Sequence, residues 1–322
     1  MTTNSIIIGR MNDLIKSPEW LESYNLWLSS RQAESTRRSY GHIWKTVLSF
    51  LQKQPGEIDR GDIVRIINYL RERGLAPATI GQYIAGISSF YSYVGKYFTE
   101  LRDDNPARDA PRPRVMQYSD AYYLTPEEAS TLLKVIDRST ILGQRDYALF
   151  LAYIMLGRRN SEIRKLRWGD FEEIGDLIWY RWSGKGKLNE RFECPRPVYD
   201  TICSYLEAAG RLNEIQDPDP IFTAVSGRFH RNGSETPISS RQVGRRLKKY
   251  AGLARLDQQR IHVHSLRHTA TVLRMEAGDS ISDLKEYLNH SSIVITQIYT
   301  HRLRARRDTS WEKVFGMLGI ST

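Results

Sequence analysis

The sequence is poor in cysteine and has no long apolar run. Only Cys194 and Cys203 occur in 322 residues, too few for a disulfide scaffold and wrongly spaced for a zinc site. No segment approaches the ~18 consecutive apolar residues of a membrane-spanning helix. The N-terminal residues lack the basic start and the longer apolar core of a signal peptide. We therefore expect a cytoplasmic protein whose cysteines are ordinary thiols.

Acidic residues are outnumbered by basic ones. The chain has 47 Lys+Arg against 37 Asp+Glu, which gives a formal net charge of +10 and a pI of about 9.5. A protein with this charge displaces counterions from a polyanion, so nucleic acid is a candidate partner. Charge alone is weak evidence, because many basic proteins bind no particular partner.

The length of the chain predicts two domains, since one hydrophobic core seldom serves so many residues. Apolar residues recur at helical spacing in four segments of the first region. The predicted helix starts are Ser17-Pro18, a cap at Ser35, a cap at Asp59, and Pro77. The predicted ends are Pro55-Gly56 for the second helix, Gly74 for the third and Gly95 for the fourth. The first region is therefore a predicted four-helix domain.

A proline-rich segment without helical period separates the two regions. Its prolines favour an extended chain, and Thr125 with Glu128 then forms a capping-box pattern that starts a new helix. The predicted organisation is a tail (1–16), a helical domain (17–106), a linker (107–120) and a second domain (121–322).

Basic side chains accompany the aromatic residues of the first region and the linker. The candidate phosphate contacts are Arg37, Arg38, Lys45, Arg112 and Arg114. The alternative is a solvated surface, the usual state of any single arginine or lysine.

The second region combines helices with a small β-hairpin. A buried helix is predicted from Asp146, with a break at Gly157, and Ser282 is the predicted cap of a later helix. Apolar residues alternate along residues 178–182, which predicts a strand, and residues 192–194 are predicted to form the second strand of a β-hairpin. Lys185 lies between two glycines at the tip of this hairpin. The predicted fold class is thus mainly α with a small β-sheet.

Cationic, imidazole and phenol side chains occur at spacings that chance seldom produces. His264 and Arg267 lie three residues apart at a predicted helix start, so both point into one pocket. His290 and Tyr299 follow, and Arg159 lies upstream. Such groups can hold a phosphodiester, neutralise its developing charge and attack it with a side-chain oxygen. Taken singly, each has an ordinary explanation in core packing.

Several short motifs resemble those of one family. They are His264-Ser265-Leu266-Arg267-His268, Leu288-Asn289-His290, Thr296-Gln297-Ile298-Tyr299, Gly157-x-Arg159-x-Ser161-Glu162 and Gly184-Lys185-Gly186. Together they resemble the signature of the tyrosine recombinases, the family of phage integrases and Xer recombinases. The helical first region resembles that family's core-binding, SAM-like domain. The resemblance implies an α+β catalytic domain for the rest of the chain.

The resemblance also implies roles for the candidate residues. Tyr299 would be the nucleophile that keeps the DNA 3′ phosphate as a phosphotyrosine, while Arg159 and Arg267 would brace the two non-bridging oxygens. Glu162 is expected to orient Arg159. No metal, cofactor or ATP is implied.

The remaining roles concern proton transfer and phosphate binding. By the same resemblance, His264 would donate a hydrogen bond and accept a proton, Lys185 would protonate the departing 5′ oxygen, and His290 would hold the phosphate. Lys187 lies on the same predicted turn and stays an alternative to Lys185. The chain departs from the family pattern at Arg158, where an apolar residue is usual, and at Asn289, where glycine is common.

The function implied is site-specific recombination of double-stranded DNA through a Holliday junction at the nucleoid, either for Xer-like resolution or for integration and excision of a mobile element. The implied assembly is a homotetramer, formed directly, from two dimers, or together with a paralogous recombinase. The segment after residue 308 would link subunits. Few residues precede the first helix, so we expect no additional arm-binding domain. The alternatives are a type IB topoisomerase-like or telomere-resolving enzyme, and a non-catalytic DNA-binding protein of the same fold.

Overall fold

The computed structural model describes residues 11, 13–113, 122–182, 190–224 and 236–288. The chain divides into two compact units, residues 1–117 and 118–322. Each unit has its own hydrophobic core. Within the described ranges, no helix is both long enough and apolar enough to cross a membrane.

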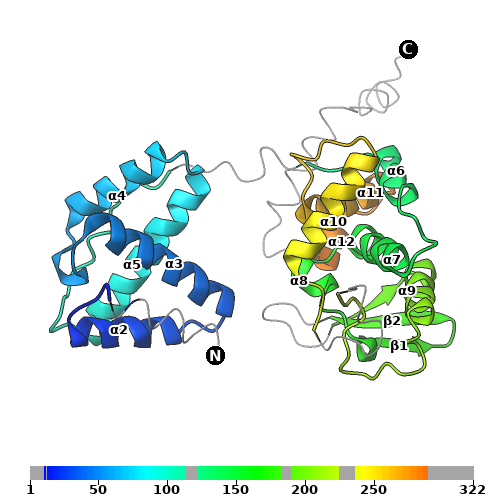
Figure 1. Cartoon of the computed structure of the whole chain (residues 1–322), viewed down its shortest axis with the longest axis horizontal. Helices are drawn as coiled ribbons and strands as arrows, with labels where there is room; N and C mark the ends of the chain where they lie inside the picture. Colours follow the sequence, from blue (N-terminus) through cyan, green and yellow to red (C-terminus); the bar gives the residue numbers. More distant parts are fainter. Residues whose placement is uncertain (1–10, 12, 114–121, 183–189, 225–235, 289–322) are drawn as a thin grey trace, which may run out of the picture. The chain divides into compact units, whose positions relative to one another are not determined.

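The first unit is helical (Figure 1). Its elements are α2 (Pro18–Ser29), α3 (Glu34–Leu51), the 3-10 helix η1 (Pro55–Glu57), α4 (Arg60–Glu72) and α5 (Pro77–Tyr97). Ser17 caps α2 and Asp59 caps α4, as the sequence predicts, because each side-chain oxygen accepts from a backbone amide of the first turn.

Two predicted helix limits in this unit are wrong. Helix α3 begins before Ser35, with Ala33 as an N-cap that has no side-chain hydrogen bond. Helix α5 continues through Gly95 to Tyr97. A Cβ at Gly95 would lie 3.1 Å from the Asp103 carbonyl oxygen, so this glycine lets the returning chain approach the helix and does not end it.

Aromatic rings fill the first core. The rings of Trp44 and Phe90 meet edge to face with centroids 4.6 Å apart, and Trp27 stacks on Tyr40 at 5.2 Å. Ala107, in the segment predicted as a linker, is fully buried in this core. The chain therefore stays packed against α5 beyond the last helix of the unit.

The second unit consists of helices with a small sheet at one end, next to α9 (Figure 1). Its elements are α6 (Pro126–Lys134), α7 (Ile141–Leu156), α8 (Asn160–Ile163), η2 (Trp168–Asp170), β1 (Phe171–Ile174), β2 (Leu177–Trp182), β3 (Glu190–Cys194), α9 (Arg196–Ala208), α10 (Ser240–Leu253), α11 (Val263–Glu276) and α12 (Ile281–Leu288). Helix α7 packs against both α9 and α11. The predicted fold class, mainly α with a small sheet, is confirmed.

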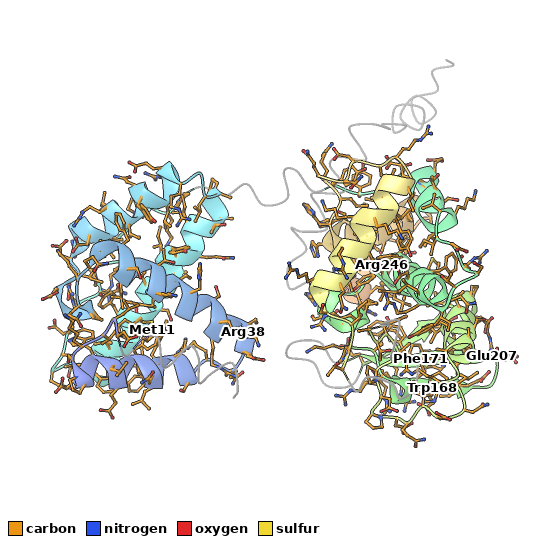
Figure 2. The ribbon with its side chains drawn as sticks, viewed as in Figure 1. Met11, Arg38, Trp168, Phe171, Glu207 and Arg246 are labelled. Carbon is orange, nitrogen blue, oxygen red and sulfur yellow. The ribbon has the colours of Figure 1, made fainter. Side chains whose placement is uncertain are left out.

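The predicted hairpin is present as β2 and β3, which pair antiparallel with Tyr180 opposite Phe192. Strand β1 adds a third strand that the sequence analysis did not predict. Its residues after Phe171 are exposed, so it lacks the alternation that identifies a half-buried strand. Trp168 and Phe171 lie near each other at this sheet (Figure 2), and both rings contact Tyr199 of α9.

Two other helix starts differ from the prediction. Helix α7 begins at Ile141, well before Asp146, because Thr140 caps it by accepting from the Gly143 amide at 3.0 Å. Helix α12 is capped by Ser280, whose hydroxyl accepts from the Asp283 amide at 3.1 Å, and not by Ser282. The Thr125–Glu128 capping box at α6 is confirmed.

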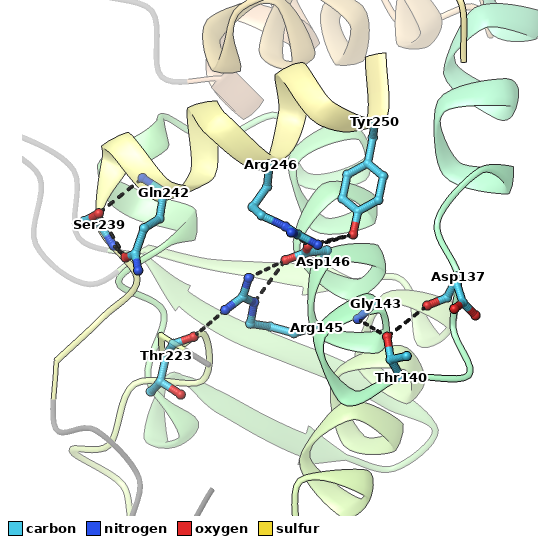
Figure 3. Close-up of polar contacts among 10 residues, drawn as sticks. All are labelled: Asp137, Thr140, Gly143, Arg145, Asp146, Thr223, Ser239, Gln242, Arg246 and Tyr250. Atoms are coloured by element: carbon cyan, nitrogen blue, oxygen red, sulfur yellow. Dashed lines mark hydrogen bonds and ion pairs between the residues drawn. The ribbon is translucent and has the colours of Figure 1, made fainter. Parts of the chain in front are cut away.

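A buried ion cluster ties three parts of the second unit together (Figure 3). Asp146 is fully buried; its Oδ1 accepts from Arg145 at 2.5 Å and its Oδ2 from Arg246 of α10 at 2.5 Å. Tyr250 donates to the same Oδ2 at 2.8 Å, and Arg145 also donates to the Thr223 carbonyl at 2.9 Å. The cluster fixes α10 against α7.

Candidate active site

Arg159 lies at the turn between α7 and α8. Gly157 ends α7 with a φ of 59°, and Arg159 then becomes the N-cap of α8. The Arg159 amide donates to Glu162 Oε2 at 2.8 Å, and its Nη1 lies 3.2 Å from Glu162 Oε1. The side chain of Arg159 stays 42% exposed. Glu162 therefore contacts both the backbone and the guanidinium of Arg159, and its orienting role stays a prediction.

Neighbouring side chains fix this turn to two other helices. Asn160 donates to the Ser240 hydroxyl at the start of α10 at 2.7 Å. Its side-chain oxygen accepts from the Tyr153 hydroxyl of α7 at 2.6 Å. Asn160 is a positioning residue that the sequence analysis missed, because its partners lie 7 and 80 residues away in the chain.

Arg267 is held inside the second unit by α11. Residues 265–272 of this helix are all buried, since α11 packs between α7, α10 and α12. Arg267 is 3% exposed, and its Nη2 donates to the Leu288 carbonyl at 2.6 Å. Its guanidinium is thus fixed at the C-terminal end of α12.

His264 lies on the first turn of α11 and shares the electrostatic environment of both arginines. Loss of surrounding water lowers its pKa below the usual 6.5, and the positive charges of Arg267 and Arg159 lower it further. His264 still lies exposed at the start of the helix, and its ring meets that of His268 edge to face, with centroids 4.5 Å apart. Three of the predicted catalytic residues therefore lie close enough to interact electrostatically, and the positive charges of the two arginines favour the neutral form of the imidazole.

Arg158, adjacent to Arg159, has a different environment. It is 1% exposed, and its Nε donates to the Tyr180 hydroxyl at 2.7 Å. Its guanidinium carbon lies 4.0 Å from the centroid of the Phe192 ring and 4.6 Å from that of Tyr287. Burial separates the two adjacent arginines, and Arg159 is the one beside Glu162 and His264.

The other predicted catalytic residues, Lys185, His290 and Tyr299, lie outside the described residues, as does Lys187. Their roles stay predictions. Within the described ranges, no group of three or more His, Cys, Asp or Glu side chains is arranged to hold a metal ion.

The predicted phosphate contacts of the first region differ in their surroundings. Arg37 donates to the carbonyls of Arg31 and Gln32 at 2.7 and 3.1 Å, so it stabilises the turn before α3. Arg38, at the N-terminal end of α3 (Figure 2), pairs with Glu34 at 2.6 Å, and both side chains are exposed. Lys45 and Arg112 are exposed, while Arg114 lies outside the described residues.

A row of cations on α10 was not predicted from the sequence. Arg241, Arg245 and Lys249 are exposed and follow one another at intervals of four residues, so they share one helix face. None of the three has an ion pair with a carboxylate in the described part of the chain. The signal was present as i, i+4, i+8 spacing within an amphipathic helix.

Comparison with known proteins decides the family. The phage integrase family matches residues 122–306, more than half of the chain, and the phage integrase N-terminal SAM-like domain matches residues 23–97. The chain belongs to the phage integrase family. The predicted family is confirmed, and with it the enzyme class, a tyrosine recombinase that cleaves and rejoins DNA through a tyrosine nucleophile.

Relatives and solved structures agree with this family. Tyrosine recombinase XerC of Caldanaerobacter subterraneus subsp. tengcongensis is 26% identical over 315 residues, covering 90% of this chain and 84% of the relative. Tyrosine recombinase XerD of Listeria innocua is 27% identical, covering 78% and 81%. The fold is similar to that of the XerH site-specific recombinase bound to palindromic difH substrate, with a TM-score of 0.64 at 18% identity and 95% coverage of both chains. It is also similar to that of a lambda integrase tetramer bound to a Holliday junction, with a TM-score of 0.62 at 16% identity, covering 87% of this chain and 76% of that one.

Proposed function

We propose that this tyrosine recombinase is a site-specific recombinase that acts on duplex DNA at the nucleoid and uses Tyr299 as its nucleophile. The observation that carries the proposal is that the Arg159 turn packs against α11, the helix of His264 and Arg267: a Cβ at Gly157 would lie 3.2 Å from Ala270 Cβ, and both arginines lower the pKa of His264. Two fixed guanidinium groups beside a neutral imidazole suit a phosphodiester better than a neutral substrate, because they complement charge on its non-bridging oxygens.

The proposed reaction is two transesterifications. The Tyr299 oxygen attacks the scissile phosphorus, the bond from phosphorus to the 5′ oxygen breaks, and the 3′ phosphate stays on the tyrosine. Lys185 gives a proton to the leaving 5′ oxygen, and the phenol proton passes to a base. A 5′ hydroxyl of the partner strand then attacks the phosphotyrosine and releases Tyr299. Because one phosphoester replaces another in each step, no external energy source is needed.

The described residues contribute to charge stabilisation and hydrogen bonding in this scheme. Arg159 and Arg267 would hold the two non-bridging oxygens while negative charge builds, and Glu162 would keep Arg159 oriented through its two carboxylate contacts. His264 is poised to accept a proton or a hydrogen bond, since its lowered pKa favours the neutral ring near pH 7. His290 is proposed as a further phosphate contact.

We propose that the exposed cations of α10 contact the DNA backbone close to this site. Ser240, at the start of α10, accepts a hydrogen bond from Asn160, so the cationic helix is joined directly to the Arg159 turn. Arg241, Arg245 and Lys249 together present three positive charges along one face.

A tetramer is proposed as the active assembly. Recombination joins two duplexes, and four strand cleavages require four nucleophiles. The apolar residues after position 308 are the proposed subunit contact. Deletion of residues 308–322 should weaken assembly on DNA while leaving single-site binding intact; unchanged assembly would exclude this contact.

Recombination of a plasmid that carries two copies of the DNA flanking the gene tests the proposed function. A recombinase converts the plasmid into products with exchanged flanks, and the Arg267→Gln variant should not. Relaxation of the plasmid without exchange would favour the topoisomerase-like alternative. Specific binding with no strand cleavage would favour the non-catalytic one.

A further inference from the structure

Arg158 is a buried cation surrounded by rings. It is 1% exposed, and its guanidinium carbon lies within 4.0 to 5.6 Å of the ring centroids of Phe192, Tyr287 and Tyr180. Such distances are those of cation–π contacts, which strengthen when the cation is removed from water. The three rings come from β3, α12 and β2. Arg158 therefore joins the sheet to the last described helix.

Its hydrogen bonds are directed at the same two elements. Nε donates to the Tyr180 hydroxyl at 2.7 Å, and Nη1 donates to the Tyr287 carbonyl. The adjacent carbonyl, that of Leu288, accepts from Arg267 Nη2 at 2.6 Å. Carbonyls in the last turn of a helix have no partner within the helix, and positive charge is favoured there. Two buried arginines thus fix consecutive carbonyls at the C-terminal end of α12.

The contacts of Arg158 lie beside the segments that carry the proposed catalytic residues. Arg158 is bonded directly to Arg159. Tyr180 and Phe192 face each other in register on the strands that flank residues 183–189, the segment containing Lys185. Leu288 precedes His290 by two residues. An apolar side chain at position 158 would fill the same space but would bond to neither the Tyr180 hydroxyl nor the Tyr287 carbonyl.

We infer that Arg158 is a positioning residue for strand cleavage. It holds the end of α12, which precedes His290 in the sequence by two residues, against the Arg159 turn and strands β2 and β3. Its effect on cleavage rests on the proposed function, whereas its effect on α12 does not. A small displacement of a positioned group lowers the rate of a reaction strongly while leaving substrate binding nearly unchanged.

The test compares Arg158→Met, which keeps apolar length without the hydrogen bonds, with Arg158→Lys, which keeps the charge. Cleavage is measured as single-turnover adduct formation on a nicked suicide duplex from the DNA flanking the gene. We expect Arg158→Met to cleave about 10- to 100-fold more slowly, with binding of the same duplex changed less than about twofold. Arg158→Lys should recover part of the rate. Tyr180→Phe removes only the hydroxyl that accepts from Arg158, so it should slow cleavage by a smaller factor than Arg158→Met. This variant replaces Arg158→Met in the test if Arg158→Met fails to fold.

A destabilised control separates positioning from a general loss of stability. Leu206→Ala shortens a fully buried side chain on α9, a helix that lies outside the Arg158 contacts. It should cleave at the wild-type rate even where its Tm falls as far as that of Arg158→Met. Equal loss of rate in both variants, or a wild-type rate in folded Arg158→Met, would overturn the inference.

Amide hydrogen exchange tests the inference without DNA. Exchange in residues 284–288 should become at least about tenfold faster in Arg158→Met, while α9 keeps its wild-type protection. Unchanged exchange at the end of α12 would overturn the inference. If the wild type formed no adduct while this exchange result held, the proposed function would fail and the positioning of α12 by Arg158 would stand.

Discussion

Arg158 and Arg159 are adjacent, yet their guanidinium groups occupy opposite environments. Arg158 is 1% exposed among aromatic rings, whereas the side chain of Arg159 is 42% exposed and contacts Glu162. Arg159 is the N-cap of α8 with an extended backbone, so successive side chains leave the turn in different directions. The Arg159 guanidinium is thereby accessible at the surface, whereas the Arg158 guanidinium is buried in the protein interior.

Loss of the Arg159 guanidinium should impair chemistry far more than stability. Because the side chain is largely exposed, Arg159→Gln should change Tm by no more than a few degrees. Cleavage should fall about 10²- to 10³-fold, the usual effect of removing one preorganised donor to developing negative charge. Single-turnover cleavage and thermal unfolding of the same preparation measure both quantities. A rate within about threefold of wild type would remove Arg159 from the proposed clamp.

Gly157→Ala should destabilise the second unit by about 2–4 kcal/mol, from left-handed strain together with overpacking. The glycine has a φ of 59°, and a Cβ there would lie 2.9 Å from Leu288 Cδ2 and 3.2 Å from Ala270 Cβ. Gly175→Ala is the matched control, because its φ is 60° and nothing lies within 4 Å of the added Cβ. The control should lose only about 1–2 kcal/mol. Urea unfolding of both variants gives the comparison, and equal losses would mean that the contact with α12 relaxes without cost.

His264 should make the free energy of unfolding depend on pH. Its folded pKa is lowered by loss of water and by two arginines, so below about pH 6.5 the unfolded chain binds more protons than the folded one. The wild type should therefore lose stability relative to His264→Gln as the pH falls below that value and through the lower folded pKa. Urea unfolding between pH 8 and pH 5 measures the difference, and parallel curves for the two proteins would contradict the assignment.

Removal of Asp146 should be among the most damaging single changes in the second unit. Asp146→Ala leaves the buried Arg145 without its carboxylate, a loss of about 3–5 kcal/mol for a broken buried pair. Tyr250→Phe removes one hydrogen bond to the same carboxylate and should cost about 1.5–3 kcal/mol. Burial also raises the pKa of Tyr250 to about 12, so it donates throughout the stable pH range. A larger loss in Tyr250→Phe than in Asp146→Ala would contradict the described network.

The cations of α10 should contribute to the salt dependence of DNA binding. The plot of log K for DNA binding against log salt concentration has a negative slope. Replacing any one of Arg241, Arg245 and Lys249 by Gln should make this slope shallower by about 0.9, if the residue neutralises one phosphate. Arg196→Gln is the charge-matched control, since Arg196, at the start of α9, pairs with Glu173 of β1 at 2.9 Å. Titration of a duplex at several salt concentrations supplies the slopes. A slope change equal to that of Arg196→Gln would exclude α10 from the interface.

Local features of the fold were predictable from the sequence because their hydrogen bonds are local. Ser17, Asp59 and Thr125 cap their helices within three residues, and alternation along residues 178–182 indicated the strand of the β2–β3 hairpin. The start of α3 was missed because Ala33 offers no capping side chain. At α12, two serines lay within two residues of each other, and the Ser280–Asp283 box decides between them.

Interactions between distant segments were not predictable. Asp146 and Arg246 are separated by 100 residues, and neither spacing nor composition connects them. The partners of Arg158 were not predictable either. In the sequence Arg158 is only a departure from a motif, whereas in the structure its hydrogen bonds join the sheet to α12. Motif spacing pointed to Arg159, His264 and Arg267, and both arginines do lie close enough to His264 to lower its pKa; their catalytic roles stay predictions.

The most direct test of the account is the covalent intermediate. Wild type and Tyr299→Phe are incubated with nicked suicide duplexes drawn from the DNA flanking the gene, without added metal, and denaturation-resistant adducts are mapped by peptide mass spectrometry. The account predicts an adduct only with the wild type, with the 3′ phosphate on Tyr299. An adduct on another residue, or an equal yield from Tyr299→Phe, would contradict it.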